Sequence, residues 1–305
     1  MKKSLYCILI VSVCFLIVGC NFFQKNNGGV DIVIGSKNLT EQVILGELLA
    51  QQIEANTDLK VARKFNLGGT GICHEGVKTG QLDAYVEYTG TAFASILKQK
   101  TITDPKAVYN YVKQEYSKQF ELELTEPLGF ENNFAMVVRG EDAKRLNLQN
   151  LSDIAKYTPQ WQAGFGYEFM EREDGFPGLA KTYNLRFLKT PRIMDLGLMY
   201  RALVEKKVDL VAGGTTDGQI VSLGLTILKD DKRYFPPYDA VPVVRQETLK
   251  KYPKLREVFK NLEDKITAKE MQTMNYQVDA EFRPVEEVVR EFLKLKNLSY
   301  SVNKF

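Results

Sequence analysis

Residues suited to catalysis are scarce in this chain. His74 is the only histidine, so a site with several histidine ligands is excluded and His74 is the sole candidate base for a nucleophilic triad. It lies in a short run, residues 72–77, where we expect a helical turn and a histidine that is structural or exposed rather than catalytic. The sequence has no Walker-type phosphate loop, no Gly-x-Ser-x-Gly elbow and no Cys-x-x-Cys pair. This favours a binding protein over an enzyme and predicts neither metal nor cofactor.

The chain begins with the pattern of a bacterial secretory leader. Lys2 and Lys3 precede an apolar stretch, residues 5–18, that is shorter than the roughly 20 residues a bilayer span needs. The following Ile-Val-Gly-Cys sequence ends at Cys20 and resembles a lipobox. That resemblance implies cleavage before Cys20 and attachment of lipid to its sulfur.

We therefore predict a signal peptide over residues 1–19 and a lipid-anchored, polar tether over residues 20–30. The folded part would then lie on the extracytoplasmic side of the cell membrane. The alternative is an ordinary signal peptide followed by an incidental cysteine. With the leader removed and Cys20 lipidated, only Cys73 remains, so no intramolecular disulfide is expected.

The net charge and the chain length restrict the possible ligands and the number of domains. The 41 Lys and Arg side chains stand against 38 Asp and Glu, and loss of the leader lysines leaves a net charge near +1. That balance offers no electrostatic attraction for nucleic acid. A mature chain of about 285 residues is long enough for two domains. We expect a monomer.

Short apolar strands alternate with amphipathic helices, which is the pattern of an α/β fold. The strands predicted in the first part of the chain cover residues 31–35, 60–65 and 82–86. The helices predicted there cover residues 40–55, 92–98 and 104–120. The same order returns with strands at 162–166 and 208–213 and helices at 178–183 and 194–205.

Two segments echo each other closely. Gly80–Tyr85 leads into Tyr88–Thr91, and Lys206–Val211 leads into Thr215–Gly218. In both, a helix ends, an acidic residue opens a strand, and a Gly/Thr turn begins the next element at the carboxyl end of the strand. Ligand loops of α/β sheets lie at that end. The echo favours two similar α/β lobes over one continuous sheet.

Strands around residues 133–138 and 238–244 are predicted to cross between the lobes as a two-strand hinge. The first lobe then comprises residues 31–131 plus 236–305, and the second comprises residues 132–235. Three C-terminal helices are expected to pack on the first lobe, near residues 253–265, 268–278 and 285–293. Two lobes on a paired hinge can close around a small molecule.

Four motifs point to a known family: Gly-Ser-Lys-Asn-Leu-Thr-Glu-Gln at 35–42, Glu-Tyr-Thr-Gly-Thr at 87–91, Thr-Asp-Gly at 216–218 and Phe-Pro-Pro-Tyr-Asp at 235–239. Together they resemble the substrate-binding proteins of osmoprotectant ABC importers, which bind glycine betaine, choline, carnitine or related quaternary amines. The resemblance extends from about Asp31 to Leu293. It implies a type II periplasmic-binding-protein fold and delivery of ligand to a membrane permease with its ATPase.

The resemblance also implies a set of site residues. The positions that match the family's carboxylate-binding residues are Lys37, Thr91 and Arg172. The positions that match its aromatic cage are Tyr88, Phe134 and Tyr238. Glu168 resembles an acidic residue near the cationic end of the ligand. A trimethylammonium group has no N–H to donate, so aromatic faces must hold it, at about 0.5–2 kcal/mol per ring. A carboxylate instead needs charge-assisted donors.

Each of these residues has a plain structural alternative. The three aromatic residues can belong to the core, and Lys37 can be a solvated residue ahead of a helix. Arg172 lies in a charged run, residues 168–174, of the kind that usually faces solvent. If the cage interpretation holds, replacing a cage tyrosine by Phe should cost little, because the ring carries the interaction.

Gly214 departs from the family pattern. The family commonly has a cage tyrosine two residues before its Thr-Asp-Gly motif, where this chain has Gly214. The missing wall argues against simple glycine betaine and leaves room for a bulkier ligand. Tyr85, Tyr167 or Tyr234 are candidates to replace the wall.

The sequence thus predicts a lipid-anchored receptor that captures a quaternary-ammonium osmoprotectant and passes it to an ABC permease. One alternative keeps the fold and changes the ligand to a histidine betaine such as ergothioneine or to a polar amino acid. Another is an extracytoplasmic enzyme or a scaffold lipoprotein, which the single histidine and the paired lobes disfavour.

Overall fold

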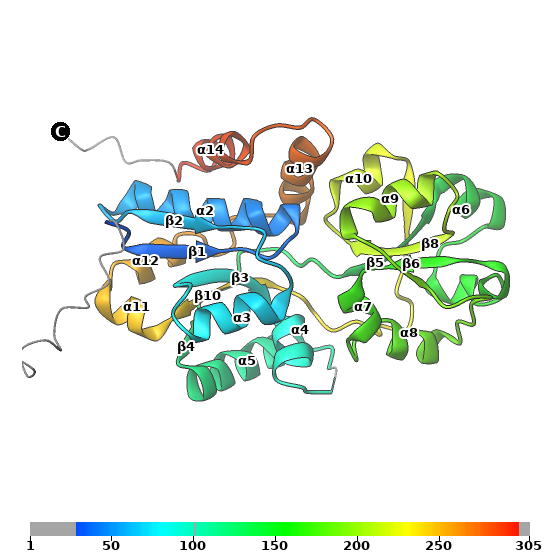
Figure 1. Cartoon of the computed structure of the whole chain (residues 1–305), viewed down its shortest axis with the longest axis horizontal. Helices are drawn as coiled ribbons and strands as arrows, with labels where there is room; N and C mark the ends of the chain where they lie inside the picture. Colours follow the sequence, from blue (N-terminus) through cyan, green and yellow to red (C-terminus); the bar gives the residue numbers. More distant parts are fainter. Residues whose placement is uncertain (1–28, 101, 299–305) are drawn as a thin grey trace, which may run out of the picture.

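The computed structural model describes residues 29–100 and 102–298 (Figure 1). The predicted signal peptide, Cys20 and most of the predicted tether therefore lie outside the described residues. Within the described part of the chain, no helix has both the length and the apolar character that a bilayer span requires.

The first sheet has five strands from two separate stretches of the chain. In spatial order they are β2 (Val61–Lys64), β1 (Ile32–Gly35), β3 (Ala84–Tyr88), β10 (Ala240–Arg245) and β4 (Leu122–Leu124). β1 pairs in parallel with β2 and β3, whereas β10 runs antiparallel to β3 and β4.

The second sheet repeats this arrangement with strands from the middle of the chain. In spatial order they are β7 (Arg192–Ile193), β6 (Ala163–Phe165), β8 (Leu210–Gly214), β5 (Phe134–Arg139) and β9 (Leu225–Leu228). β6 pairs in parallel with β7 and β8, and β5 runs antiparallel to β8 and β9. The prediction of two similar α/β lobes is confirmed. β3 and β8 hold equivalent places in the two sheets.

Helices cover both faces of each sheet (Figure 1). Those of the first lobe are α2 (Thr40–Asn56), α3 (Thr70–Lys78), α4 (Thr89–Thr91), the π-helix η2 (Ala92–Ile96), α5 (Pro105–Phe120), α11 (Gln246–Lys251), α12 (Leu255–Lys260), α13 (Ala268–Asp279) and α14 (Val285–Leu295). Those of the second are α6 (Gly140–Leu146), the 3₁₀ turns η3 (Leu151–Ile154) and η4 (Thr158–Gln160), α7 (Tyr167–Glu171), α8 (Phe176–Tyr183), α9 (Leu196–Val204) and α10 (Gly218–Ser222).

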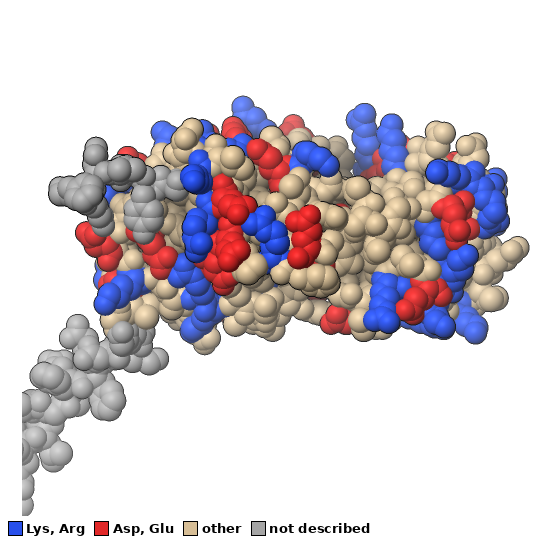
Figure 2. Space-filling view, turned by 90° about the horizontal axis from the view of Figure 1, so that it is seen from above, with Lys and Arg blue, Asp and Glu red and all other residues tan. Residues whose placement is uncertain are grey.

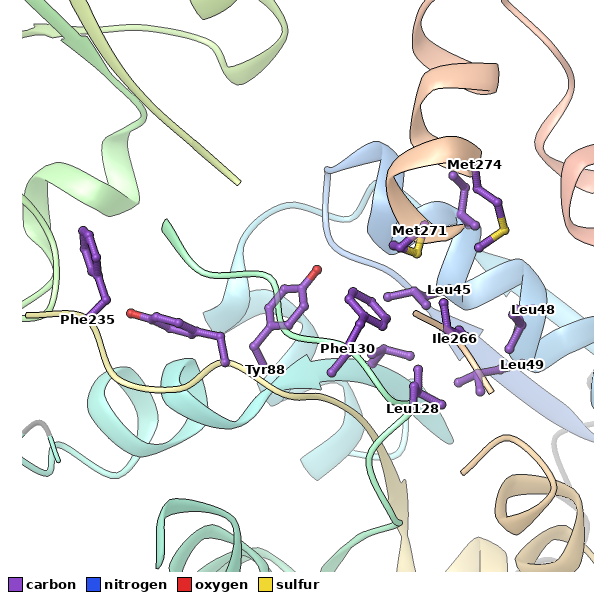
Figure 3. Close-up of a cluster of buried hydrophobic side chains, with 14 of the residues drawn as sticks. Leu45, Leu48, Leu49, Tyr88, Leu128, Phe130, Phe235, Ile266, Met271 and Met274 are labelled. Carbon is purple, nitrogen blue, oxygen red and sulfur yellow. The ribbon is translucent and has the colours of Figure 1, made fainter. Parts of the chain in front are cut away.

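The core of the first lobe is built around α2. Its Leu45, Leu48 and Leu49 are fully buried and meet Met271 of α13 in one cluster (Figure 3). Each buried leucine contributes roughly 1.5–3 kcal/mol. Because sheet and helices cover α2 on opposite sides, four of its polar residues are also buried, namely Glu41, Gln42, Glu47 and Gln52.

Two segments of irregular structure connect the lobes, over residues 129–133 and 235–239 (Figure 1). They touch through one antiparallel bridge between Glu131 and Asp239. The predicted crossing strands, 133–138 and 238–244, instead become β5 and β10 only after the crossing. A segment forms strand hydrogen bonds only where a sheet strand lies beside it, and the crossing segments have no such neighbour except at the single bridge.

Helix α13 of the first lobe packs on α10 of the second. A Cβ on Gly218, the first residue of α10, would collide with the backbone of Tyr276 in α13. Only glycine allows this approach, which gives the Thr-Asp-Gly motif a packing role. In Figure 2, basic and acidic side chains are mixed over the visible face of both lobes, without a field of one sign.

Candidate functional site

A cavity of about 380 Å³ lies between the lobes, next to the crossing segments. Its walls come from the loops after β1, β3, β6 and β8, from the crossing, and from α7, α9 and α13. The residues proposed from the sequence all line it: Lys37, Tyr88, Thr91, Phe134, Glu168, Arg172, Gly214 and Tyr238. The fold thus brings together side chains that are up to 201 positions apart in the sequence.

Lys37 is a buried cation rather than a solvated residue. Its side chain is 5% exposed, and Nζ lies 2.5 Å from Glu87 Oε1. Nζ also lies 4.7 Å from the centroid of the Tyr88 ring. A lysine ammonium has three donors, so the pair with Glu87 leaves Lys37 with donors to offer a ligand.

Arg172 is mostly withdrawn from solvent, with its side chain 9% exposed, contrary to the expectation of a solvated charged face. Its Nε and Nη2 donate to the Asp174 carboxylate at 2.8 and 2.6 Å, and Nη1 donates to Thr91 Oγ1 at 3.2 Å. Burial opposes its charge, but the bonds to Asp174 prevail and the pKa of Arg172 is raised. The guanidinium lies 5.1 Å from the Phe134 ring centroid and 5.9 Å from that of Tyr238. With Lys37 over Tyr88, each of the three proposed cage rings thus already has a protein cation next to it.

The tyrosine hydroxyls of the site are bonded to buried carboxylates. Tyr88 Oη donates to Glu41 Oε1 at 2.5 Å, and Tyr238 Oη donates to Asp174 Oδ2 at 2.6 Å. Burial, followed by the neighbouring carboxylate, raises the pKa of both tyrosines. Replacing either tyrosine by Phe would therefore take a donor from a buried carboxylate, which lowers stability, while the predicted small effect on ligand affinity stays a prediction.

Glu168 reaches across the cavity to the other lobe. Its Oε1 accepts the backbone N–H of Thr70, the first residue of α3, at 2.9 Å. An anion at a helix N-terminus is favoured by the unpaired N–H groups and the helix dipole. Gly69 permits this contact, since a Cβ there would collide with the Glu168 carboxylate.

Sequence reasoning missed Glu41, although it lies inside the 35–42 motif. Its Oε1 accepts from Tyr88 Oη and from Asn132 Nδ2, and its Oε2 accepts from Thr216 Oγ1 and from Asn275 Nδ2. These partners belong to the first lobe, the crossing, the second lobe and α13. Glu41, which lines the cavity, therefore joins the two lobes through these hydrogen bonds.

The space beside Gly214 is not open, which corrects the idea of a simply missing wall. A Cβ on Gly214 would lie 2.5 Å from Asn132 Oδ1 and 3.0 Å from Asp217 Oδ1. Polar side chains thus occupy the position where a ring would begin. Asp217 Oδ2 accepts the Gly214 N–H at 2.8 Å and Tyr200 Oη at 2.5 Å. Burial raises the pKa of Asp217 to about 6.

Of the three tyrosines proposed to replace a ring at Gly214, only Tyr167 lines the cavity. Tyr85 is fully buried and bonded to Glu87, and the Tyr234 hydroxyl bonds the carbonyls of residues 173 and 175. Tyr200 of α9, which the sequence did not single out, lines the cavity instead.

His74 lies away from the cavity. It is 4% exposed and packs against Tyr116 and Phe120 in the first lobe. Burial, aided by Lys78, lowers its pKa to about 4, so it is neutral at pH 7. Cys73 beside it is buried and free.

Residues 30–295 match a family described as the substrate-binding domain of ABC-type glycine betaine transport systems. The chain belongs to this family. It is 35% identical over 303 residues to the carnitine transport binding protein OpuCC of Listeria monocytogenes, covering 97% of this chain and 98% of that protein. The family consists of transport substrate-binding proteins, which in ABC importers are extracytoplasmic.

Other similarities point the same way. The chain is 34% identical over 296 residues to the ergothioneine transport permease/ergothioneine binding protein EgtU of Helicobacter pylori, covering 96% of this chain and 53% of that protein. Among solved structures, that of a glycine betaine/carnitine/choline ABC transporter matches with a TM-score of 0.74 and 35% identity, covering 88% of this chain and 99% of the other.

Proposed function

We propose that this protein captures a quaternary-ammonium zwitterion in the interlobe cavity and delivers it to an ABC permease with its ATPase. The observation that carries the proposal is the meeting of Lys37, Thr91 and Arg172 with the rings of Phe134 and Tyr238 in one buried cavity. Donors for a carboxylate thus lie beside aromatic rings, and a ligand cation would share these rings with the Arg172 guanidinium that is already next to them. We propose no turnover of the bound compound.

The charge balance of the cavity supports a ligand with a cationic group. Among the described residues that line it, Lys37 and Arg172 are the only Lys or Arg. The lining carboxylates are Glu41, Glu168, Asp195, Asp217 and Asp279. Since both cations are paired with further carboxylates, a net anion would be repelled here, and a zwitterion can satisfy both kinds of group.

We further propose that the chain acts as a monomer with lobes at 31–131 plus 236–305 and at 132–235. Arg172 and Glu168 of the second lobe already bond Thr91 and Thr70 of the first. A ligand held between the lobes would add contacts to both and so stabilise this closed arrangement.

A ligand screen tests the function. In thermal-shift measurements on a soluble form beginning at Asn21, a ligand at 100 times its dissociation constant should stabilise by about 2.7 kcal/mol. We expect this for a carboxylate-bearing quaternary amine, from a panel of glycine betaine, carnitine, choline, ergothioneine and polar amino acids. Stabilisation by amino acids alone would contradict the proposal, as would conversion of a ligand to product.

We propose that lipid on Cys20 anchors the protein to the membrane. Cys20→Ser should move it from the membrane fraction to the soluble or unprocessed fraction, whereas Cys73→Ser should not. Unchanged membrane association of Cys20→Ser would overturn the anchor.

A further inference from the structure

Asp174 does not line the cavity, but it holds two side chains that do. It is 1% exposed and lies in the turn between α7 and α8. Its Oδ1 accepts Arg172 Nε at 2.8 Å, and its Oδ2 accepts Arg172 Nη2 and the Tyr238 hydroxyl, both at 2.6 Å. Arg172 and Tyr238 belong to the cavity wall and Asp174 does not. Asp174 can therefore act on a ligand only through these two partners.

The hydrogen bonds of Arg172 leave a defined part of its guanidinium unused. A guanidinium carries five N–H donors in one rigid plane. Asp174 takes the Nε donor and one of the two on Nη2, and Thr91 Oγ1 takes one of the two on Nη1. Within residues 29–100 and 102–298 these are the hydrogen bonds of the guanidinium, so one donor remains on each terminal nitrogen. Two such nitrogens can hold both oxygens of one carboxylate.

The position of Asp174 decides which edge of the guanidinium a ligand can meet. The edge formed by Nε and Nη2 faces Asp174, which lies outside the cavity. The rings of Phe134 and Tyr238 lie beside the guanidinium, with centroids at 5.1 and 5.9 Å. The Tyr238 ring is itself fixed by its hydroxyl bond to Asp174. One buried carboxylate thus orients both the cation and an adjoining aromatic wall.

We propose that Asp174 is the positioning residue for carboxylate recognition, because it holds Arg172 with one donor on Nη1 and one on Nη2 left for the ligand. The inference rests on the proposed function, since it concerns how the same cavity selects a carboxylate-bearing ligand. A guanidinium that is already oriented loses less freedom when the ligand binds. Discrimination between a betaine and choline then depends on a residue outside the cavity wall.

The negative charge of Asp174, taken alone, would have the opposite effect. A carboxylate beside Arg172 weakens the attraction of the guanidinium for a second carboxylate. If Asp174 only neutralised Arg172, removal of its charge would favour a betaine over choline. If Asp174 positions Arg172, the same change should disfavour the betaine. The sign of the change in the affinity ratio therefore separates the two roles.

Calorimetry on the soluble form from Asn21 measures this ratio. The ligands are glycine betaine, L-carnitine and choline, with choline measured by competition, and the ratio compares the tighter carboxylate-bearing ligand with choline. Asp174→Asn should lower the ratio about 10-fold, because a misplaced guanidinium loses a charge-assisted bond to the ligand. A ratio that rises or stays constant in the folded variant would overturn the positioning role and leave the proposed function intact. If the unaltered protein binds none of the three, the proposed function fails and the inference with it.

Asp174→Glu provides a second variant if Asp174→Asn does not fold. It keeps the negative charge and moves the carboxylate by one methylene, so only the position of the charge changes. It should also lower the ratio of betaine to choline affinity, by a smaller factor. An unchanged ratio in the folded Glu variant would contradict the proposal.

Asp209→Asn is the matched control, in the same lobe. Asp209 accepts Arg139 Nη2 at 2.7 Å and the Gln162 N–H at 2.9 Å, and neither Asp209 nor Arg139 lines the cavity. This variant should lower stability in urea denaturation and leave the affinity ratio unchanged. An equal fall of the ratio in the control would assign the effect to a general loosening of the second lobe and overturn the role of Asp174.

Discussion

The two strand-end loops at 88–91 and 214–218 occupy equivalent places in the two sheets but carry opposite chemistry. After β3, Tyr88 and Thr91 offer a ring and a hydroxyl, beside Lys37. After β8, Gly214 and Asp217 offer no ring and an acceptor. The same backbone plan thus builds a cavity with two unlike ends, one for each lobe.

The preceding pair of loops shows the same contrast. Lys37 follows β1, and Glu168 follows the equivalent strand β6. A lysine and a glutamate therefore face the cavity from matching positions. A pseudo-symmetric fold places its loops together, and the residue types on them decide what is bound.

Replacing Glu41 should cause the largest loss of stability, because Glu41 joins both ends of the cavity. Glu41→Ala leaves Tyr88, Asn132, Thr216 and Asn275 without their acceptor and should lower the free energy of unfolding by about 3 kcal/mol or more. Urea denaturation measures this. Glu54→Ala, which breaks only a partly exposed pair with Arg63, should cost less than about 1 kcal/mol. Equal costs would show that Glu41 does not hold the lobes together.

The hydroxyls of Tyr88, at the end of β3, and Tyr238, in the crossing, should have the next largest effect on stability. Tyr88→Phe and Tyr238→Phe should each lower the free energy of unfolding by about 1–2 kcal/mol, because a buried carboxylate loses a donor. The corresponding Ala variants should also lose ligand affinity through the missing ring. Phe variants as stable as the wild type would restore the simpler view in which the ring alone matters.

Lys37 tests whether the cationic end reads a carboxylate. Lys37→Ala should weaken the best betaine about 10-fold relative to choline, which equals about 1.4 kcal/mol. The measurement to compare is the ratio of the two affinities, betaine to choline. Removing Lys37 leaves Glu87 unpaired, and this side effect acts on the binding of both ligands. A constant betaine-to-choline ratio in calorimetry would mean that the carboxylate lies elsewhere.

The smallest expected change in stability is at Asp239, in the crossing segment 235–239 and outside both ends of the cavity. Burial, then Glu131 and Asp264, raise the pKa of Asp239 from 3.8 to about 6. The folded state therefore binds more protons than the unfolded state between these values, and stability falls as pH rises through this window. Asp239→Asn should remove the fall and stabilise by about 1 kcal/mol at pH 8, after allowance for solvent screening, but hardly at pH 4. Urea denaturation across pH 4–8 measures this, and a slope unchanged by the substitution would assign it to other groups.

The order of strands and helices was readable because apolar periodicity and turn residues are local signals. The boundaries were less so: β3 runs on to Tyr88 and β8 to Gly214, beyond the predicted ends at Val86 and Gly213. Both strands continue because each pairs antiparallel with a neighbour, β10 or β5, that is far away in sequence. Helix α7 was also missed, since its charged sequence conceals the buried Phe169.

The residues around the cavity were largely named from motifs, and their positions agree with the fold. Their partners were not foreseeable. Lys37 meets Glu87 across 50 positions, and Glu41 gathers donors from as far as Asn275. Sequence by itself determined which charged and aromatic side chains the chain carries and where each strand would present them. Only the tertiary structure decided which charges neutralise one another and which acceptors remain unpaired, because burial and pairing depend on segments that folding alone brings together.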